Sequence, residues 1–96
     1  ISFYVSPKQK TMFYVYLLES QLDKSWYIGY TSDLRKRYLS HNKGENQSTR
    51  NKKPWKLIYY EAYANKIDAK KREEFLKSGS GRNFLKRQLN NYLKSV

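Results

Sequence analysis

The chain has 96 residues, of which 39% are apolar, so it has length for one domain with a modest core and no room for a second. Its 20 Lys and Arg residues outnumber 8 Asp and Glu residues, and the net charge of +12 makes nucleic acid the first partner to consider, a plain basic surface being the alternative. The chain has no cysteine, which excludes disulfides, thiolate catalysis and Cys-ligated zinc. Because His41 is the single histidine, we expect carboxylates to be the metal ligands and a hard ion such as Mg²⁺ to be the metal.

The regular pattern starts at Met12, the only methionine. Residues 1–11 before it are interpreted as a native extension or a non-native addition, and residues 12–96 as the single domain. The run from Met12 to Leu18 is aromatic and β-branched with no breaker, which is typical of a strand buried on both faces. After a short polar loop, Trp26 to Tyr30 resumes the strand pattern, so we expect the two strands to pair antiparallel.

A helix is predicted to follow the second strand. Thr31 or Ser32 supplies the N-cap oxygen, and Asp33 favours the first turn. The helix runs to about His41 and ends before Gly44. Residues 45–53 contain no apolar side chain, which predicts a mobile surface loop with no place in the core.

The second half of the chain predicts one more strand and two helices. Residues 55–64 form an aromatic strand, and residues 65–77 form a helix capped by the asparagine at its start. The pair Gly79 and Gly81 closes that helix, and residues 82–96 form a last basic helix. The predicted fold is therefore α+β, a small three-stranded antiparallel sheet flanked by helices in the order β-β-α-β-α-α.

One face of the first helix carries two polar groups among its apolar residues. Leu34, Arg37, Tyr38 and His41 share this face because they are three or four positions apart. An arginine on an inward face needs an anion, and its planar fork suits a phosphate; the alternative is a stem lying along apolar surface with its head in water. His41 is by default a solvated helix-end residue, but its place beside Arg37 favours proton transfer or phosphate contact.

The second helix offers two adjacent acids, Glu73 and Glu74. Periodicity places Glu73 at the border of the apolar face and points Glu74 away from it, so Glu73 is the better candidate for a metal ligand. The alternative is that both are surface acids paired with neighbouring Lys and Arg residues.

Ten tyrosines are more than packing requires. The hydroxyls of Tyr16 and Tyr27 lie on paired strands near Arg37, where they are candidates to orient or deprotonate a water molecule. Stacking on bases and a plain role as strand formers are the alternatives.

In their order, these segments resemble the GIY-YIG nuclease domain, and in particular its small stand-alone bacterial branch, a URI-type domain. Tyr14-Val15-Tyr16 looks like the first signature with its glycine replaced by Tyr14, and Tyr27-Ile28-Gly29 is the second signature unaltered. Three later blocks are also similar to the family: residues 31–42, Pro54-Trp55-Lys56-Leu57, and Arg72-Glu73 followed by Leu76-Lys77-Ser78-Gly79.

The resemblance implies one active site that cleaves DNA phosphodiester bonds with a single Mg²⁺ or Mn²⁺ ion. It implies that Tyr16 and Tyr27 take the places of the signature tyrosines, Arg37 that of the phosphate-binding arginine and Glu73 that of the metal-binding glutamate. His41 stands where members have a histidine or a tyrosine. Tyr30 stands where certain members have a lysine, and Asn83 is the nearest candidate for a late asparagine of the family.

We therefore expect a cytoplasmic, metal-dependent endonuclease or nickase of low sequence specificity that acts on duplex or branched DNA, in repair or recombination. No small-molecule cofactor is expected, and no membrane, since no apolar run approaches the roughly 20 residues that cross a bilayer. The alternatives are a non-catalytic basic module that binds DNA or RNA and an accessory protein of a ribonucleoprotein particle. The expected nucleic-acid contacts are Tyr30, Lys36, Arg50, Lys52, Lys53, Arg82 and Lys86.

Overall fold

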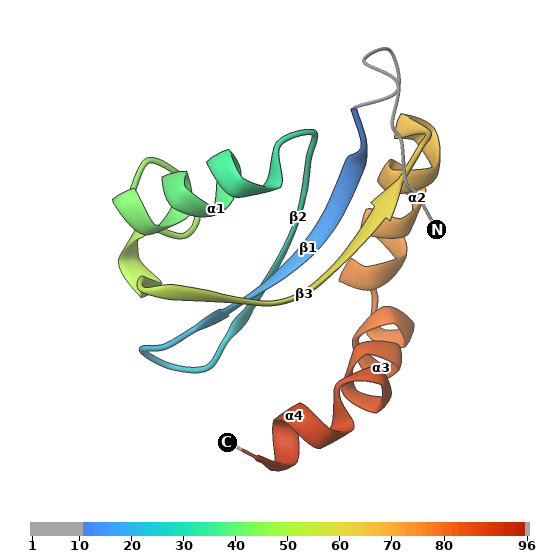
Figure 1. Cartoon of the computed structure of the whole chain (residues 1–96). Helices are drawn as coiled ribbons and strands as arrows, with labels where there is room; N and C mark the ends of the chain where they lie inside the picture. The colour runs from blue at the N-terminus through green and yellow to red at the C-terminus, as the bar shows by residue number, and fades with distance from the viewer. Residues whose placement is uncertain (1–10, 96) are drawn as a thin grey trace, which may run out of the picture.

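The computed structural model describes residues 11–95, so the interpretation of residues 1–11 falls, except for Thr11, outside the described residues. The elements, shown in Figure 1, are β1 (Phe13–Ser20), β2 (Trp26–Thr31), α1 (Leu34–Lys43), the 3-10 turn η2 (Arg50–Lys52), β3 (Trp55–Tyr63), α2 (Lys66–Lys77), α3 (Gly79–Gln88) and α4 (Asn90–Lys94). Among the described residues, no helix has the length and apolar character needed to span a membrane.

The three strands form one antiparallel sheet in the order β2-β1-β3, so the predicted α+β fold and its element order are confirmed. β1 is the central strand, and its residues from Val15 to Ser20 are buried, as predicted for a strand covered on both faces. The structure adds two short elements to this order: η2 lies in the segment predicted to be a loop, and the predicted last helix is divided at Leu89 into α3 and α4.

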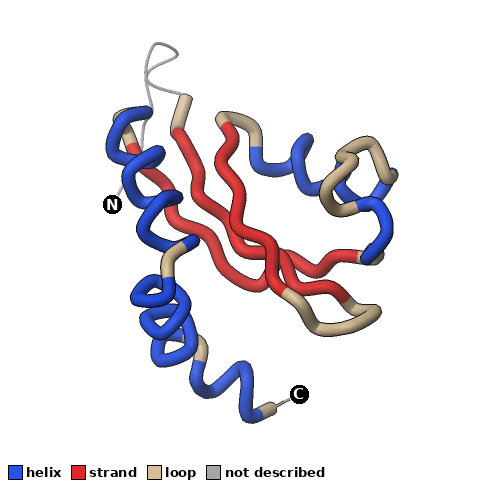
Figure 2. Tube along the Cα trace, turned by 180° about the vertical axis from the view of Figure 1, so that it is seen from behind, coloured by secondary structure: helices blue, strands red, loops and turns tan. Residues whose placement is uncertain are grey.

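The sheet separates two packing layers, because alternate residues of a strand point to opposite faces. α1 covers one face, and α2 and α3 cover the other, as Figures 1 and 2 show from opposite sides. The core on the α1 face contains Tyr16, Leu18 and Trp55, and the core on the α2 face contains Val15, Leu17, Ala69, Leu76 and Leu85.

A charged cluster fixes α2 to β3. Glu61 of β3 accepts hydrogen bonds from the hydroxyls of Tyr59 and Tyr63, both at 2.5 Å, and from Arg72 of α2 at 2.8 and 3.0 Å. Burial opposes the ionisation of Glu61, but the hydrogen bonds from Arg72 and the two tyrosines outweigh it and hold the pKa of Glu61 below its ordinary value. Arg72 is therefore engaged on the β3 side of α2, and its neighbour Glu73 lies on another side of the helix.

Two predicted helix boundaries were wrong. Asp33 is the N-cap of α1, since its carboxylate accepts from the Lys36 amide at 3.1 Å, whereas Thr31 is still paired in β2. Gly79 and Gly81 lie inside α3 instead of closing α2. A Cβ at Gly81 would lie only 2.0 Å from the Phe75 carbonyl oxygen, so this glycine lets α3 pack directly against the end of α2.

Candidate active site

The site is built around a tyrosine that crosses a glycine. Tyr16 of β1 lies opposite Gly29 of the edge strand β2, and its side chain extends across that glycine. A Cβ at position 29 would lie 2.3 Å from the Tyr16 hydroxyl oxygen, far inside any permitted contact. Only glycine leaves room for this path, because it has no side chain where another group approaches the backbone closely. The pairing of these two residues explains the spacing of the two sequence signatures.

His41 meets the Tyr16 hydroxyl from α1. The imidazole is fully buried; its Nε2 lies 2.9 Å from the Tyr16 hydroxyl oxygen, and its Nδ1 lies 2.7 Å from Oγ1 of Thr49. The rings of Tyr16 and Tyr27 contact it edge-on, with centroids 5.8 and 5.1 Å away. Burial, and next the charge of Arg37, lowers the pKa of His41 below 6.5, so the ring is neutral at pH 7. The default of a solvated helix-end histidine was wrong, because the ring is buried against Tyr16 and Thr49.

Thr49 is the residue that the sequence analysis missed. It lies in the polar segment 45–53, predicted to be a loop outside the core, yet Thr49 is only 1% exposed. Its carbonyl oxygen accepts from the Trp55 indole at 2.8 Å, and the Asn42 side chain bonds both backbone groups of Trp55. The segment is therefore fixed between α1 and β3. Its lack of apolar residues predicted a loop outside the core, and this prediction was wrong because the residue that the segment buries is a threonine held by hydrogen bonds.

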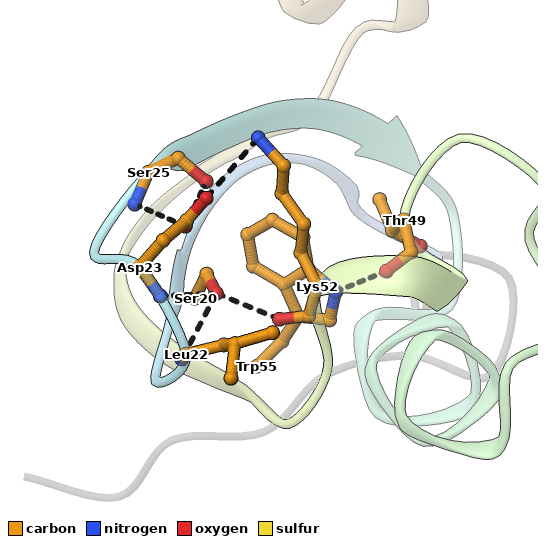
Figure 3. A network of polar contacts seen from close by, with 7 residues as sticks. All are labelled: Ser20, Leu22, Asp23, Ser25, Thr49, Lys52 and Trp55. Carbon is orange, nitrogen blue, oxygen red and sulfur yellow. Dashed lines mark hydrogen bonds and ion pairs between the residues drawn. The ribbon is translucent and has the colours of Figure 1, made fainter.

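Further hydrogen bonds hold the end of this segment against the β1–β2 turn (Figure 3). The Ser20 hydroxyl donates to the Lys52 carbonyl at 2.7 Å, and the Lys52 amide donates to the Thr49 carbonyl at 3.1 Å. The Lys52 ammonium pairs with Asp23 in the turn at 3.3 Å. Thr49 is thus placed by backbone contacts on both sides.

Arg37 lies at the border of α1 and is exposed, unlike the buried position expected from the helical face. Its Nη1 donates to the Tyr30 carbonyl at 3.4 Å, and it lines a hollow of about 350 Å³ together with Lys36. Burial, and then Tyr27, raises the pKa of Tyr16 to about 12, while the neighbouring guanidinium of Arg37 acts in the opposite direction. Arg37 is therefore close to the Tyr16 hydroxyl and also accessible to an anion from solvent.

Glu73 approaches the same edge of the sheet from α2. Its side chain is 15% exposed and Glu74 is exposed, so the predicted placement of the two acids relative to the apolar face of the helix is confirmed. Glu73 pairs with Lys77 at 3.1 Å and Lys70 at 3.8 Å, and the Lys70 ammonium lies over the Tyr30 ring of β2 at 4.6 Å. The negative charge of Glu73 contributes to the raised pKa of Tyr16, so the carboxylate lies within electrostatic reach of that hydroxyl.

Three of the five predicted site residues, Tyr16, Tyr27 and His41, are in mutual contact. Arg37 and Glu73, from α1 and α2, both influence the pKa of Tyr16. Tyr27 lines a second hollow of about 250 Å³ with Lys77, separate from the hollow lined by Arg37.

The predicted nucleic-acid contacts divide into two regions. Lys36 and Arg82 line the hollows along β2, and Lys86 lies in the next hollow, beside α4. Arg50, Lys52 and Lys53 are exposed around η2, as is Asn83 in α3. The Tyr30 ring stacks on Phe13 with centroids 6.4 Å apart and packs against the core of the α2 face, so its carbonyl and not its ring faces Arg37.

Residues 11–95 hold no cluster of three or more His, Asp or Glu side chains that could bind a metal ion, so an ion at Glu73 would have one carboxylate as its protein ligand. One carboxylate, completed by water and by substrate phosphate oxygens, is a donor set that suits Mg²⁺. The two lysines paired with Glu73 compete with a cation for this carboxylate.

Comparison with known proteins shows the family to which the chain belongs. Residues 12–90 match the family model described as the GIY-YIG catalytic domain. A UPF0213 protein of Streptococcus pneumoniae is 44% identical over 85 residues, and the match covers 75% of this chain and 85% of that protein. A UPF0213 protein of Clostridium perfringens is 43% identical over 67 residues, and the match covers 69% of this chain and 71% of that protein. The solution structure of the UPF0213 protein BH0048 from Bacillus halodurans is similar, with 36% identity, a TM-score of 0.50 and coverage of 84% of each chain. The chain therefore belongs to the GIY-YIG nuclease-domain family, among small bacterial relatives of the UPF0213 type.

Proposed function

We propose that this protein is a metal-dependent endonuclease or nickase that hydrolyses DNA phosphodiester bonds at the edge of β2. The observation that carries the proposal is the Tyr16 hydroxyl, which bonds to buried His41 and is acted on by the charges of both Arg37 and Glu73. A tyrosine hydroxyl with a guanidinium and a carboxylate in electrostatic reach provides a proton acceptor, a phosphate-binding cation and a metal-binding anion for phosphodiester hydrolysis. Membership of the GIY-YIG family supports this function.

The proposed mechanism assigns one task to each group. Hydrolysis needs an activated water, neutralisation of charge on the phosphorane-like transition state and help for the leaving oxygen. The Arg37 guanidinium binds non-bridging phosphate oxygens, for which its paired donors are suited. Tyr16 in its phenolate form accepts the proton of the attacking water. Glu73 holds the metal ion, which when bound supplies Lewis-acid stabilisation of the departing oxygen.

Substrate binding is part of this mechanism because Tyr16 is only 1% exposed. Arg37 is the exposed charged neighbour of the Tyr16 hydroxyl, so a phosphate bound by Arg37 would lie near that hydroxyl. The two lysines that form ion pairs with Glu73 affect how tightly a metal ion can bind there. We expect metal binding to be weak without DNA, since one carboxylate and two competing ammonium groups hold a cation poorly.

The preferred substrate follows from the basic groups along the site. The hollows beside β2 are lined by Lys36, Arg37, Lys77 and Arg82, and about half to two-thirds of protein–DNA hydrogen bonds go to phosphate and sugar from side chains that include Lys and Arg. We propose low sequence specificity, duplex or branched DNA as substrate, and a role in repair or recombination.

Plasmid nicking in Mg²⁺ tests the proposal with two matched pairs of variants. We expect nicking by the parent chain and a loss of about 10² or more in rate for Glu73→Gln and Arg37→Ala, in line with the cost of removing a charge-stabilising group. Glu74→Gln and Arg35→Ala change the same charges on neighbouring exposed positions and should retain activity. Glu73→Gln should still bind DNA in a gel-shift assay, since it removes no phosphate contact.

The second candidate is a non-catalytic module that binds DNA or RNA through the same fold. It is favoured by the two ion pairs of Glu73, which occupy the one carboxylate available to a metal. If the parent chain cleaves no duplex, branched or single-stranded substrate in Mg²⁺ or Mn²⁺ while binding them, this candidate replaces the nuclease.

A further inference from the structure

A buried chain of hydrogen bonds runs from the Tyr16 hydroxyl through His41 to Thr49. Tyr16 and Thr49 are each 1% exposed, and His41 is fully buried. A neutral imidazole carries one N–H and one acceptor nitrogen, so the two bonds of this chain have a direction. Either Thr49 donates to Nδ1 and Nε2–H donates to Tyr16, or Tyr16 donates to Nε2 and Nδ1–H donates to Thr49.

The surroundings of the two hydroxyls favour the first direction. Within residues 11–95, the imidazole is the one hydrogen-bond partner of the Thr49 hydroxyl, so the second direction would leave the Thr49 hydrogen buried without an acceptor. The imidazole is likewise the one hydrogen-bond partner of the Tyr16 hydroxyl within residues 11–95, but this hydroxyl lies within electrostatic reach of exposed Arg37 and of the Glu73 carboxylate. Of the two hydroxyls, Tyr16 is therefore the one beside the proposed site, where water or an anionic oxygen can accept its hydrogen.

Both hydrogen bonds are well formed. The separation is 2.7 Å between Thr49 Oγ1 and His41 Nδ1 and 2.9 Å between Nε2 and the Tyr16 oxygen, and both values are within the range of O–H and N–H donors, so the surroundings of the hydroxyls decide the direction.

We propose that Thr49 is a positioning residue that fixes His41 in the tautomer protonated on Nε2, so that the imidazole donates to the Tyr16 oxygen. The Nε2–H then stabilises the Tyr16 phenolate, whereas the opposite direction would make Tyr16 the donor and oppose the loss of its proton. The orientation of His41 by Thr49 stands on the geometry alone. The catalytic consequence rests on the proposed function of Tyr16.

Because His41 is the only histidine, protein labelled with ¹⁵N-histidine gives the signals of one ring, and their chemical shifts distinguish protonated from unprotonated nitrogen. We expect the parent chain at pH 7.5, without DNA, to carry the proton on Nε2. A parent ring protonated on Nδ1 would overturn the proposal, whether or not any variant folds.

Three variants separate tautomer control from simple packing. Thr49→Ser keeps the donor hydroxyl and should keep the Nε2–H tautomer, while Thr49→Val keeps the shape and should yield a mixture with Nδ1–H. Ser48→Ala removes an exposed hydroxyl beside Thr49 that forms no hydrogen bond with His41, and it should leave the ring signals unchanged. A Thr49→Val protein with the same tautomer as the parent would show that Thr49 only fills space.

Nicking kinetics give the second readout. Thr49→Val should lower kcat about tenfold or more with little change in KM for DNA, since the base is weakened and no phosphate contact is lost, and Thr49→Ser should restore the rate. A parent chain without nicking would refute the proposed function alone, because the ring signals of the DNA-free protein still decide the role of Thr49.

Discussion

Replacing Gly29 with alanine is expected to disable the site without altering any side chain that acts on the substrate. The new Cβ would lie 2.3 Å from the Tyr16 hydroxyl oxygen and 2.4 Å from Cζ. To reach ordinary contact the Tyr16 ring must move by about 1 Å, because a well-packed core has little space to absorb the overlap. Such a shift breaks or strains the 2.9 Å hydrogen bond to His41, which is fully buried and held in turn by Thr49.

The expected cost has two parts. Overpacking of a core costs about 1–3 kcal/mol, and a buried polar group that loses its partner costs about 1–3 kcal/mol. We therefore expect Gly29→Ala to lower the free energy of unfolding by about 2–6 kcal/mol. The nicking rate should fall by about 10²–10⁴, the usual contribution of a positioned general base.

Urea denaturation followed by circular dichroism measures the first effect, and Mg²⁺-dependent plasmid nicking measures the second. Gly79→Ala is the matched control, because a Cβ there meets no heavy atom within 4 Å and the residue starts α3. This control should be neutral or stabilising by up to about 1 kcal/mol. If Gly29→Ala has the same denaturation midpoint and nicking rate as the Gly79→Ala control, the crossing of Tyr16 over Gly29 does not support the site.

Three further predictions concern the proton acceptor, the charged cluster and the basic surface. Because the pKa of Tyr16 is about 12, the fraction of Tyr16 in the phenolate form grows as pH rises. We therefore expect kcat/KM to increase by up to about tenfold per pH unit between pH 7 and 9. A plateau above pH 7 would instead identify His41, whose pKa is below 6.5, as the base. Because the pKa of Glu61 is lowered on folding, its ionisation stabilises the fold above the ordinary value of 4.5, and this stabilisation is lost as pH falls through the lowered value. Glu61→Gln should therefore lower the free energy of unfolding by about 2 kcal/mol at pH 7, with a gap to the parent that narrows in acid, and an equal denaturation midpoint at pH 7 would contradict the role of this cluster. Replacing Arg50, Lys52 and Lys53 together with alanine should lower the slope of log K against log salt by up to about 3, and an unchanged slope would remove the η2 region from the DNA interface.

Much of the fold could be predicted because local pattern and tertiary burial agree there. The three strands are aromatic and β-branched, and the capping asparagine of α2, Asn65, accepts from two amides as its sequence context indicates. Glu73 could be chosen over Glu74 because a helix with one buried face distinguishes adjacent positions.

The parts that could not be predicted depend on contacts distant in sequence. Thr49 is buried because His41 and Trp55 bond to it, and no local property of a polar segment reveals those partners. Gly81 was interpreted as a helix stop, whereas its need for glycine comes from the close approach of Phe75. Arg37 was placed inward by spacing, but the edge of the sheet ends beneath it and leaves it exposed.

A crystal structure of the Tyr16→Phe variant with a short DNA duplex and Mn²⁺ tests the central claim most directly, because this variant lacks the proposed base and should leave the substrate uncut. We expect the anomalous signal of Mn²⁺ on the Glu73 carboxylate and a phosphodiester group bound by Arg37 at the edge of β2. A duplex bound with Mn²⁺ away from Glu73, or with no phosphate in contact with Arg37, would contradict the proposed active site.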